Sequence, residues 1–232
     1  MKIFNSLLSA IVVVICCSLG SSTAKGQCYG NGIPSNELGI RLGSVTNASG
    51  VGGASIAERN AYASALNGIH YKRYGTSGAF RAALSFTRFD YENRANCPDC
   101  IRTDAKINGL KFRVGYEWFT FVGPLEPFIG IDAIASYDSY DGETWTVGDR
   151  PYEETLWDRE RRGFGVGPVA GLRVYLGYAI SISAETSVEA MMYGRTTTIS
   201  QITPENTTTI ASNNYFDTTF QPLNWLSLNV LF

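Results

Sequence analysis

Alternation of apolar and other residues is the strongest signal in this chain, and it is clearest over residues 225–232. One phase of that segment holds only large apolar residues: Leu226, Leu228, Val230 and Phe232. The other phase carries Trp225, Ser227 and Asn229. Because successive side chains of a strand point to opposite faces, the segment is predicted to be a β-strand with one apolar face.

The same alternation predicts seven further strands. They cover about residues 37–45, 66–74, 79–91, 105–121, 127–140, 163–176 and 179–198. In the clearest of them, Leu110, Phe112 and Val114 alternate with Lys111 and Arg113. A short helix is predicted over residues 55–65, where apolar residues have roughly helical spacing.

The predicted connections alternate between long and short. Tight turns are expected at residues 75–78, 123–126 and 177–178, where glycine and proline gather. Long loops are expected between them, including residues 141–162 and a Thr/Asn-rich stretch that ends near residue 219. This layout is typical of outer-membrane barrels, which have short turns on one side and long loops on the other. We therefore predict an all-β fold, an eight-stranded antiparallel up-and-down transmembrane β-barrel.

The two phases of the strands differ in a way that predicts which side faces outward. One phase carries Leu, Ile, Val, Phe and Ala, and the other carries Gly, Ser and Ala with scattered charges. A narrow eight-stranded interior suits small residues with a few long charged ones, so the apolar phase is expected to face lipid. The alternative is a soluble lipocalin-like barrel with the apolar phase inside, but its outer phase should be rich in Lys, Glu and Thr instead of Gly.

Aromatic residues fall near the predicted strand ends, as expected for two belts at the membrane–water interfaces. The belt at the turn end would consist of Tyr116, Trp118, Phe119, Phe121, Phe128 and Phe232. The belt at the loop end would consist of Phe89, Tyr91, Tyr137, Phe164 and Tyr193.

Composition suits a membrane barrel or an all-β secreted domain, and it does not indicate a nucleic-acid binder. Charged residues make up 17% of the chain, below the ~25% of an average soluble domain. The net charge of −2 implies no broad basic surface for nucleic acid. Apart from the start of the chain, no segment has the length and apolarity of a membrane helix, so a membrane-spanning reading requires a barrel.

The start of the chain is predicted to be a signal peptide, residues 1–26. Lys2 precedes an apolar core at residues 11–19, and small residues follow it. A transmembrane anchor is the alternative, but the core is too short to span a bilayer. A lipoprotein signal is disfavoured because no small residue directly precedes Cys16, Cys17 or Cys28. Residues 27–36 are expected to be an irregular arm, and residues 37–232 the barrel.

Three cysteines follow the signal: Cys28, Cys97 and Cys100. The Cys97–Cys100 spacing is that of a CxxC motif, but neither a βαβ setting for redox chemistry nor a second pair for zinc accompanies it. We predict a small disulfide between Cys97 and Cys100 that pins a loop, with Cys28 unpaired or competing.

Charged residues of the interior phase are the main candidate site. They are Arg41, Lys72, Arg81, Lys111, Arg113, Glu117, Asp132, Arg173, Glu185 and Glu189. An isolated buried charge is costly, so these groups are predicted to form ion pairs that plug the lumen. A gated narrow pore lined by the same groups is the sharper alternative. The single histidine, His70, is expected to fill the interior and to hydrogen-bond to a carboxylate.

No motif for catalysis, phosphate binding or metal ligation is present, so neither an enzyme nor a cofactor is expected. The segment 141–162 instead combines Trp145, Tyr152 and Trp157 with Arg159, Arg161 and Arg162. Tryptophan, tyrosine and arginine are favoured at binding surfaces. This segment is therefore a candidate for contact with an extracellular ligand, or it packs on other loops.

With its strand pattern and a terminal Phe232, residues 37–232 resemble the small eight-stranded outer-membrane barrels of the OmpA/OmpX type. The resemblance implies location in the bacterial outer membrane, contact with its lipid, monomeric state, and Phe232 as part of a signal read by the barrel-assembly machinery. It also implies a structural or surface-interaction role without catalysis. A narrow porin for small solutes and an accessory barrel of a secretion system remain the alternatives.

Overall fold

The computed structural model describes residues 35–46, 62–64, 66–75, 78–93, 101–119, 125–146, 154–177, 179–202 and 207–232. All regular structure within these residues is β-strand. The strands are β1 (Asn36–Thr46), β2 (Tyr62–Ser64), β3 (Gly68–Tyr74), β4 (Gly78–Asn93), β5 (Ile101–Phe119), β6 (Leu125–Thr146), β7 (Glu154–Tyr175), β8 (Ile180–Ile202) and β9 (Thr207–Leu231). In the described part of the chain, no helix is long and apolar enough to cross a membrane.

The strands form one antiparallel sheet that closes on itself as a ring. From β3 to β9 each strand pairs with the next, and β1 pairs with β9 on one edge. On its other edge β1 pairs with β3 through residues 36–40 and with β2 through residues 44–46. The nine strands therefore occupy eight positions, and the predicted all-β class with eight up-and-down antiparallel strands is confirmed.

The two phases of each strand separate into an apolar outer face and a polar inner face. On β6, Ile129 and Ile131 are exposed, whereas Asp132 is buried. On β9, Val230 is exposed, whereas Ser227 and Asn229 are fully buried. Large apolar side chains are likewise exposed on the other strands of the ring: Leu38, Ile40, Ile69, Phe80, Trp118, Phe164, Val166, Leu172, Ile180 and Met192. We call this outer surface of the ring the apolar belt.

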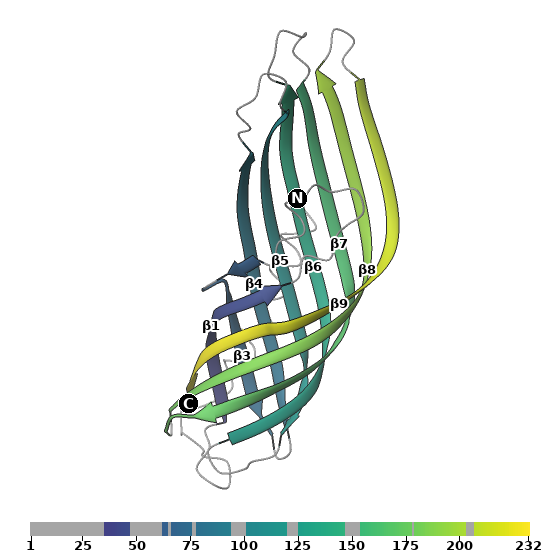
Figure 1. Cartoon of the computed structure of the whole chain (residues 1–232). Helices are drawn as coiled ribbons and strands as arrows, with labels where there is room; N and C mark the ends of the chain where they lie inside the picture. Colours follow the sequence, from purple (N-terminus) through teal and green to yellow (C-terminus); the bar gives the residue numbers. More distant parts are fainter. Residues whose placement is uncertain are drawn as a thin grey trace.

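Above the ring, β4–β9 continue as a tall curved sheet that β1 and β3 do not reach (Figure 1). We call this part the projecting wall and define it as residues 86–93, 101–110, 137–146, 154–163, 193–202 and 207–222. Among the described residues, β4 pairs with β3 only up to Ser85, and β9 pairs with β1 only down to Leu223. Beyond those residues each of the two strands has a strand partner on one side only.

The boundary between the ring and the wall lies where the pairing of β1 with β9 becomes irregular. The register shifts between Arg41 and Gly43 and again between Gly43 and Val45. Pro222 lies beside this irregularity on β9, and it has no backbone N–H to donate to a neighbouring strand. Bulges bend a strand and increase its twist, so they direct the upper part of β9 away from β1.

The wall corrects two expectations from the sequence. Residues 141–162 are not one loop, because β6 continues to Thr146 and β7 begins at Glu154. The Thr/Asn-rich stretch is not a loop to residue 219, because β9 begins at Thr207 and pairs with β8 along its length. Both strand segments are solvated on both faces, so they lack the apolar periodicity that marks a strand in sequence.

Two further expectations change near the start of the sheet and at the strand ends. The predicted helix over residues 55–65 is wrong at Tyr62–Ser64, which forms β2, and its other residues lie outside the described ranges. Phe128 and Tyr193 belong to no outer belt, because both point inward and are buried. Each shares its phase with interior residues, Phe128 with Asp132 and Tyr193 with Met191. The predicted signal peptide and residues 27–34 of the arm also lie outside the described residues.

Close packing inside the ring predicts that added volume at Gly165 is poorly tolerated. A Cβ atom there would lie 2.0 Å from the carbonyl oxygen of Ala190 and 2.7 Å from the sulfur of Met191. We expect Gly165→Ala to lower the free energy of unfolding by about 1–3 kcal/mol. The matched control is Gly194→Ala on the next strand, where the nearest atom is the side-chain oxygen of Asn214 at 3.3 Å. Urea unfolding of both variants tests this, and equal midpoints would contradict it.

Candidate functional site

The interior of the ring holds charged side chains that lie close to one another. Arg173 of β7 lies at the end of the ring where the short turns are. Its guanidinium is fully buried and contacts three carboxylates. Nη2 lies 2.7 Å from Glu117 Oε1, Nε lies 3.3 Å from Glu37 Oε2, and Nη1 donates to Glu126 Oε1. Arg173 therefore joins β1, β5 and β6 across the interior.

Lys72 and Arg81 extend this cluster towards the middle of the ring. Lys72 Nζ lies 2.9 Å from Glu117 Oε2 and 3.7 Å from Glu37 Oε1. Arg81 lies 3.2 Å from both Glu117 and Asp132 and 2.6 Å from Glu185. Glu37 thus contacts both Lys72 and Arg173, and Glu117 contacts both of these and Arg81, so the pairs form one continuous network instead of isolated bridges.

The upper part of the network centres on Arg113. Its guanidinium lies 3.4 Å from Asp132 and 3.5 Å from Glu185, and Nη2 donates to Glu189. Lys111 Nζ lies 2.8 Å from the other oxygen of Glu189. Lys111 is the most exposed cation of the set, with 27% of its side chain accessible.

Arg41 is held differently, beside the seam between β1 and β9. Its Nη2 donates to the backbone carbonyl of Asn224, and its guanidinium stacks 4.6 Å from the centre of the Trp225 ring. Asn224 in turn donates to Glu185 over 2.9 Å. His70 packs edge-on against Trp225, and its Nε2 lies 3.2 Å from Glu37 Oε1.

Together these residues form what we call the interior ion network. Its six cations are Arg41, Lys72, Arg81, Lys111, Arg113 and Arg173, and its six carboxylates are Glu37, Glu117, Glu126, Asp132, Glu185 and Glu189. Charges of the two signs balance, so the network needs no bound ion for neutrality. Partners at hydrogen-bonding distance compensate the cost of removing these groups from water.

Nine of the ten charged residues singled out from the sequence form ion pairs in this network, and Arg41 joins it through the backbone carbonyl of Asn224 instead. Two members, Glu37 and Glu126, were not predicted. Glu37 lies at the start of β1 and was not assigned to the interior, although it shares its phase with Arg41. Glu126 was placed in a turn, but it lies on β6 in phase with Asp132 and is fully buried. Glu37 lies inside the predicted strand 37–45, so its phase alone identifies it, whereas Glu126 is found by extending the alternation one residue before the predicted strand 127–140.

A small apolar layer covers the network on the side of the wall. Ile134, Met191 and Tyr193 form a buried cluster, and Tyr215 packs against it. Tyr193 and Tyr215 stack with their ring centres 5.4 Å apart. Among the described residues, the interior is thus filled by ion pairs below and by apolar side chains above.

Beyond this layer the inner face of the wall is concave and carries aromatic and arginine side chains. Arg161 lies 4.7 Å from the centre of the Tyr193 ring and 2.8 Å from Asp138 Oδ2. Arg195 lies 5.8 Å from the ring of Tyr215, and Arg159 lies 6.0 Å from that of Trp157. We call the inward side chains of residues 138–142, 157–163, 193–199 and 213–215 the concave face.

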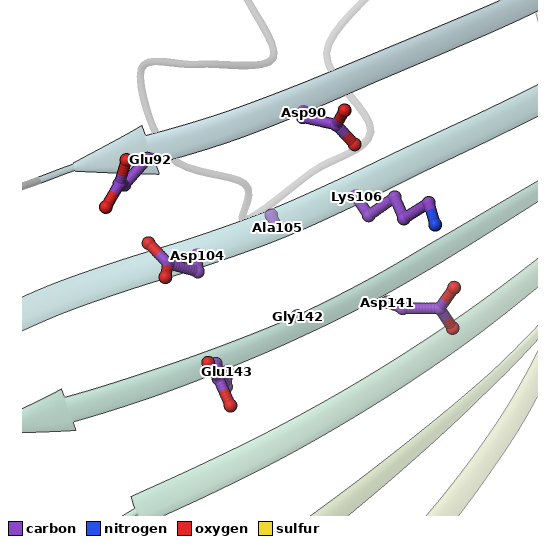
Figure 2. A pocket seen from close by; sticks show the side chains of 8 residues that line it. All are labelled: Asp90, Glu92, Asp104, Ala105, Lys106, Asp141, Gly142 and Glu143. Carbon is purple, nitrogen blue, oxygen red and sulfur yellow. The ribbon is translucent and has the colours of Figure 1, made fainter.

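The outer face of the wall is acidic. A shallow hollow of about 590 Å³ lies there, lined by Asp90, Glu92, Asp104, Ala105, Lys106, Asp141, Gly142 and Glu143 (Figure 2). Neighbouring Asp158 has its pKa raised, first by partial burial and then by the negative charges of Asp141 and Glu160. Within the described residues no group of His, Cys, Asp and Glu is arranged to hold a metal ion. The predicted disulfide Cys97–Cys100 and the position of Cys28 lie outside the described residues.

Comparison of the chain with protein-family models, with curated proteins and with solved structures gave no match. Inference about function therefore rests on the geometry of the ring and the wall.

Proposed function

We propose that this chain is a non-enzymatic outer-membrane β-barrel whose ring spans the bilayer and whose projecting wall meets partners outside the cell. The observation that carries the proposal is the inverted polarity of the ring, apolar outside and ionic inside. In a soluble protein so many large apolar side chains on one continuous outer surface would be exposed to water at high cost. In a bilayer the same surface is solvated by lipid.

The closed backbone of the ring supports the same proposal. A bilayer core offers no hydrogen-bonding partners, so a sheet crosses it only when no strand edge is left open. Within the ring, the pairing of β1 with β9 satisfies that condition. Asn36 and Phe232 complete the seam by exchanging backbone hydrogen bonds of 3.0 and 2.9 Å.

Membrane fractionation tests the proposal directly. We expect the protein produced in a Gram-negative bacterium to fractionate with the outer membrane, to need detergent for extraction, and to run faster on gels when unheated than when boiled. External protease should cleave within the wall and spare the ring. A freely water-soluble monomer without detergent would overturn the proposal.

The filled interior predicts that the reconstituted protein does not conduct. Ion pairs across the ring leave its cations and carboxylates committed to one another, and the layer of Ile134, Met191 and Tyr193 covers them. We expect no stable open channel in planar bilayers, under conditions in which a general porin gives clear steps. Reproducible conductance steps from the purified protein would favour the narrow-porin alternative.

A further inference from the structure

We infer that the concave face of the wall binds an extended anionic polysaccharide, one that carries carboxylate or sulfate groups. This inference rests on the proposed function, because it takes the wall to lie outside the cell. It names the class of ligand that the wall binds, which cannot be inferred from the ring and its apolar belt.

The first argument is the order of side chains across the concave face. By strand register, Tyr193 of β8 stands opposite Tyr215 of β9 and Gly163 of β7. The next inward row holds Asp138, Arg161, Arg195 and Asn213. The two rows above it hold Tyr140 with Arg159 and then Gly142 with Trp157. Aromatic rings and guanidinium groups therefore recur row by row.

The second argument is that glycines let the rings lie flat on the sheet. A Cβ atom at Gly142 would lie 2.2 Å from the Trp157 ring, and one at Gly163 would lie 2.4 Å from the Tyr193 ring. Both rings therefore cover the backbone of a neighbouring strand. A flat ring offers its face to the C–H groups of a sugar ring, and a guanidinium beside it pairs with an acidic group in a planar, two-bond geometry.

The third argument is charge. Arg159, Arg161 and Arg195 exceed the carboxylates of Asp138 and Asp217 on the inner face. The outer face is the reverse, because the carboxylates of Asp90, Glu92, Asp104, Asp141, Glu143, Asp158 and Glu160 outnumber the cations of Arg88, Lys106 and Arg162. An anionic polymer is therefore drawn to the concave side of the wall and repelled from the other.

Hydrogen bonding in the wall favours a sugar polymer over a peptide. From β6 to β8 the strands have partners on both sides throughout the concave face, so their main-chain groups are committed to the sheet, and among the described residues of this face only β9 presents an open edge. A peptide usually gains affinity at a sheet by main-chain pairing, and only a strand edge offers that. The rows from Tyr193 to Trp157 extend over roughly 20 Å at the usual rise of a strand, which suits an oligomer and exceeds a single sugar.

Binding to the full-length protein in detergent micelles or nanodiscs tests this inference. The probes are polygalacturonate for carboxylates, heparin for sulfates, neutral dextran, and polyglutamate as an acidic peptide. We expect saturable binding of polygalacturonate or heparin that weakens as salt is raised, and little binding of dextran or polyglutamate. The pair Arg159→Gln/Arg195→Gln should weaken glycan binding by about tenfold or more. Trp157→Ala should weaken it independently.

Arg162→Gln is the matched control, because Arg162 lies on the same strand, its side chain is 69% exposed, and it pairs with Glu160 instead of facing the concave side. It should bind glycan like the unmodified protein. Equal loss in the control, unchanged binding in the double variant, or equal binding of polyglutamate would each overturn the inference. Heat-modifiable mobility confirms that each variant is folded. If the protein inserts into membranes but binds no glycan, this inference alone is wrong. If the protein fails to insert, the proposed function is wrong.

Discussion

Arg173→Met is expected to lower the free energy of unfolding by about 3–5 kcal/mol, the largest effect of any single substitution considered. The substitution roughly keeps side-chain volume but removes the cation shared by Glu37, Glu117 and Glu126. Those carboxylates are all fully buried, so the cost comes mainly from leaving negative charge uncompensated in the interior. Urea unfolding of the refolded protein in lipid vesicles, followed by tryptophan fluorescence, measures it.

Arg162→Met provides the control for this prediction. Arg162 also forms an ion pair, with Glu160 at 3.0 Å, but both side chains are largely exposed to solvent. A pair of that kind contributes about 0–1 kcal/mol. Similar losses for the two variants would show that Arg173 is not held in a dry ion network. Partial recovery in Arg173→Met/Glu126→Gln would show that the uncompensated carboxylate is the cause.

Ile129→Arg is expected to destabilise the bilayer-inserted protein by about 2–4 kcal/mol. Ile129 lies on the outer face of β6 within the apolar belt and is 64% exposed. In water an arginine at such a site would not change the stability. In lipid the guanidinium must either keep water around it or extend to the lipid headgroups, and both cost free energy. The size of the destabilisation therefore distinguishes lipid from water as the surroundings of the ring. Refolding yield in vesicles and the urea midpoint measure it.

Ile210→Arg is the matched control. Ile210 is 70% exposed on β9, but it lies in the projecting wall, away from the belt. We expect a change of at most about 1 kcal/mol there, because both residues would face water. If Ile129→Arg proved as mild as Ile210→Arg, the belt would not be in contact with lipid, and the membrane proposal would fail.

The sequence predicted the ring well because each ring strand has two unlike surroundings. On β5, Phe112 and Val114 face outward and Arg113 and Glu117 face inward. Apolar and charged residues therefore alternate along the sequence with a period of two. The same logic placed ten charged residues in the interior. It could not state which cation meets which carboxylate, because pairings such as Lys111 with Glu189 join strands far apart in the chain.

The wall was predicted poorly for a related physical reason. Residues 207–214 of β9 are exposed throughout, so neither phase of the strand needs to be apolar. Hydrogen bonding to β8 fixes this segment as a strand, and threonine suits an extended backbone. Backbone pairing of this kind leaves little trace in hydrophobic periodicity. The binding residues Trp157, Arg159 and Arg161 were identified by type, but their arrangement on one concave face required the register of β6 to β9.

The seam between β1 and β9 also bears on the order of folding. Asn36 and Phe232 are 196 residues apart, whereas β3 through β9 pair with sequence neighbours across short connections. Contacts of low sequence separation form first, because closing a long loop costs more chain entropy. Hairpins from β3 to β9 are thus expected to accumulate as an open sheet, with ring closure as the slow final event. Until then two unsatisfied edges stay available, so the nascent protein is most vulnerable to aggregation in that interval.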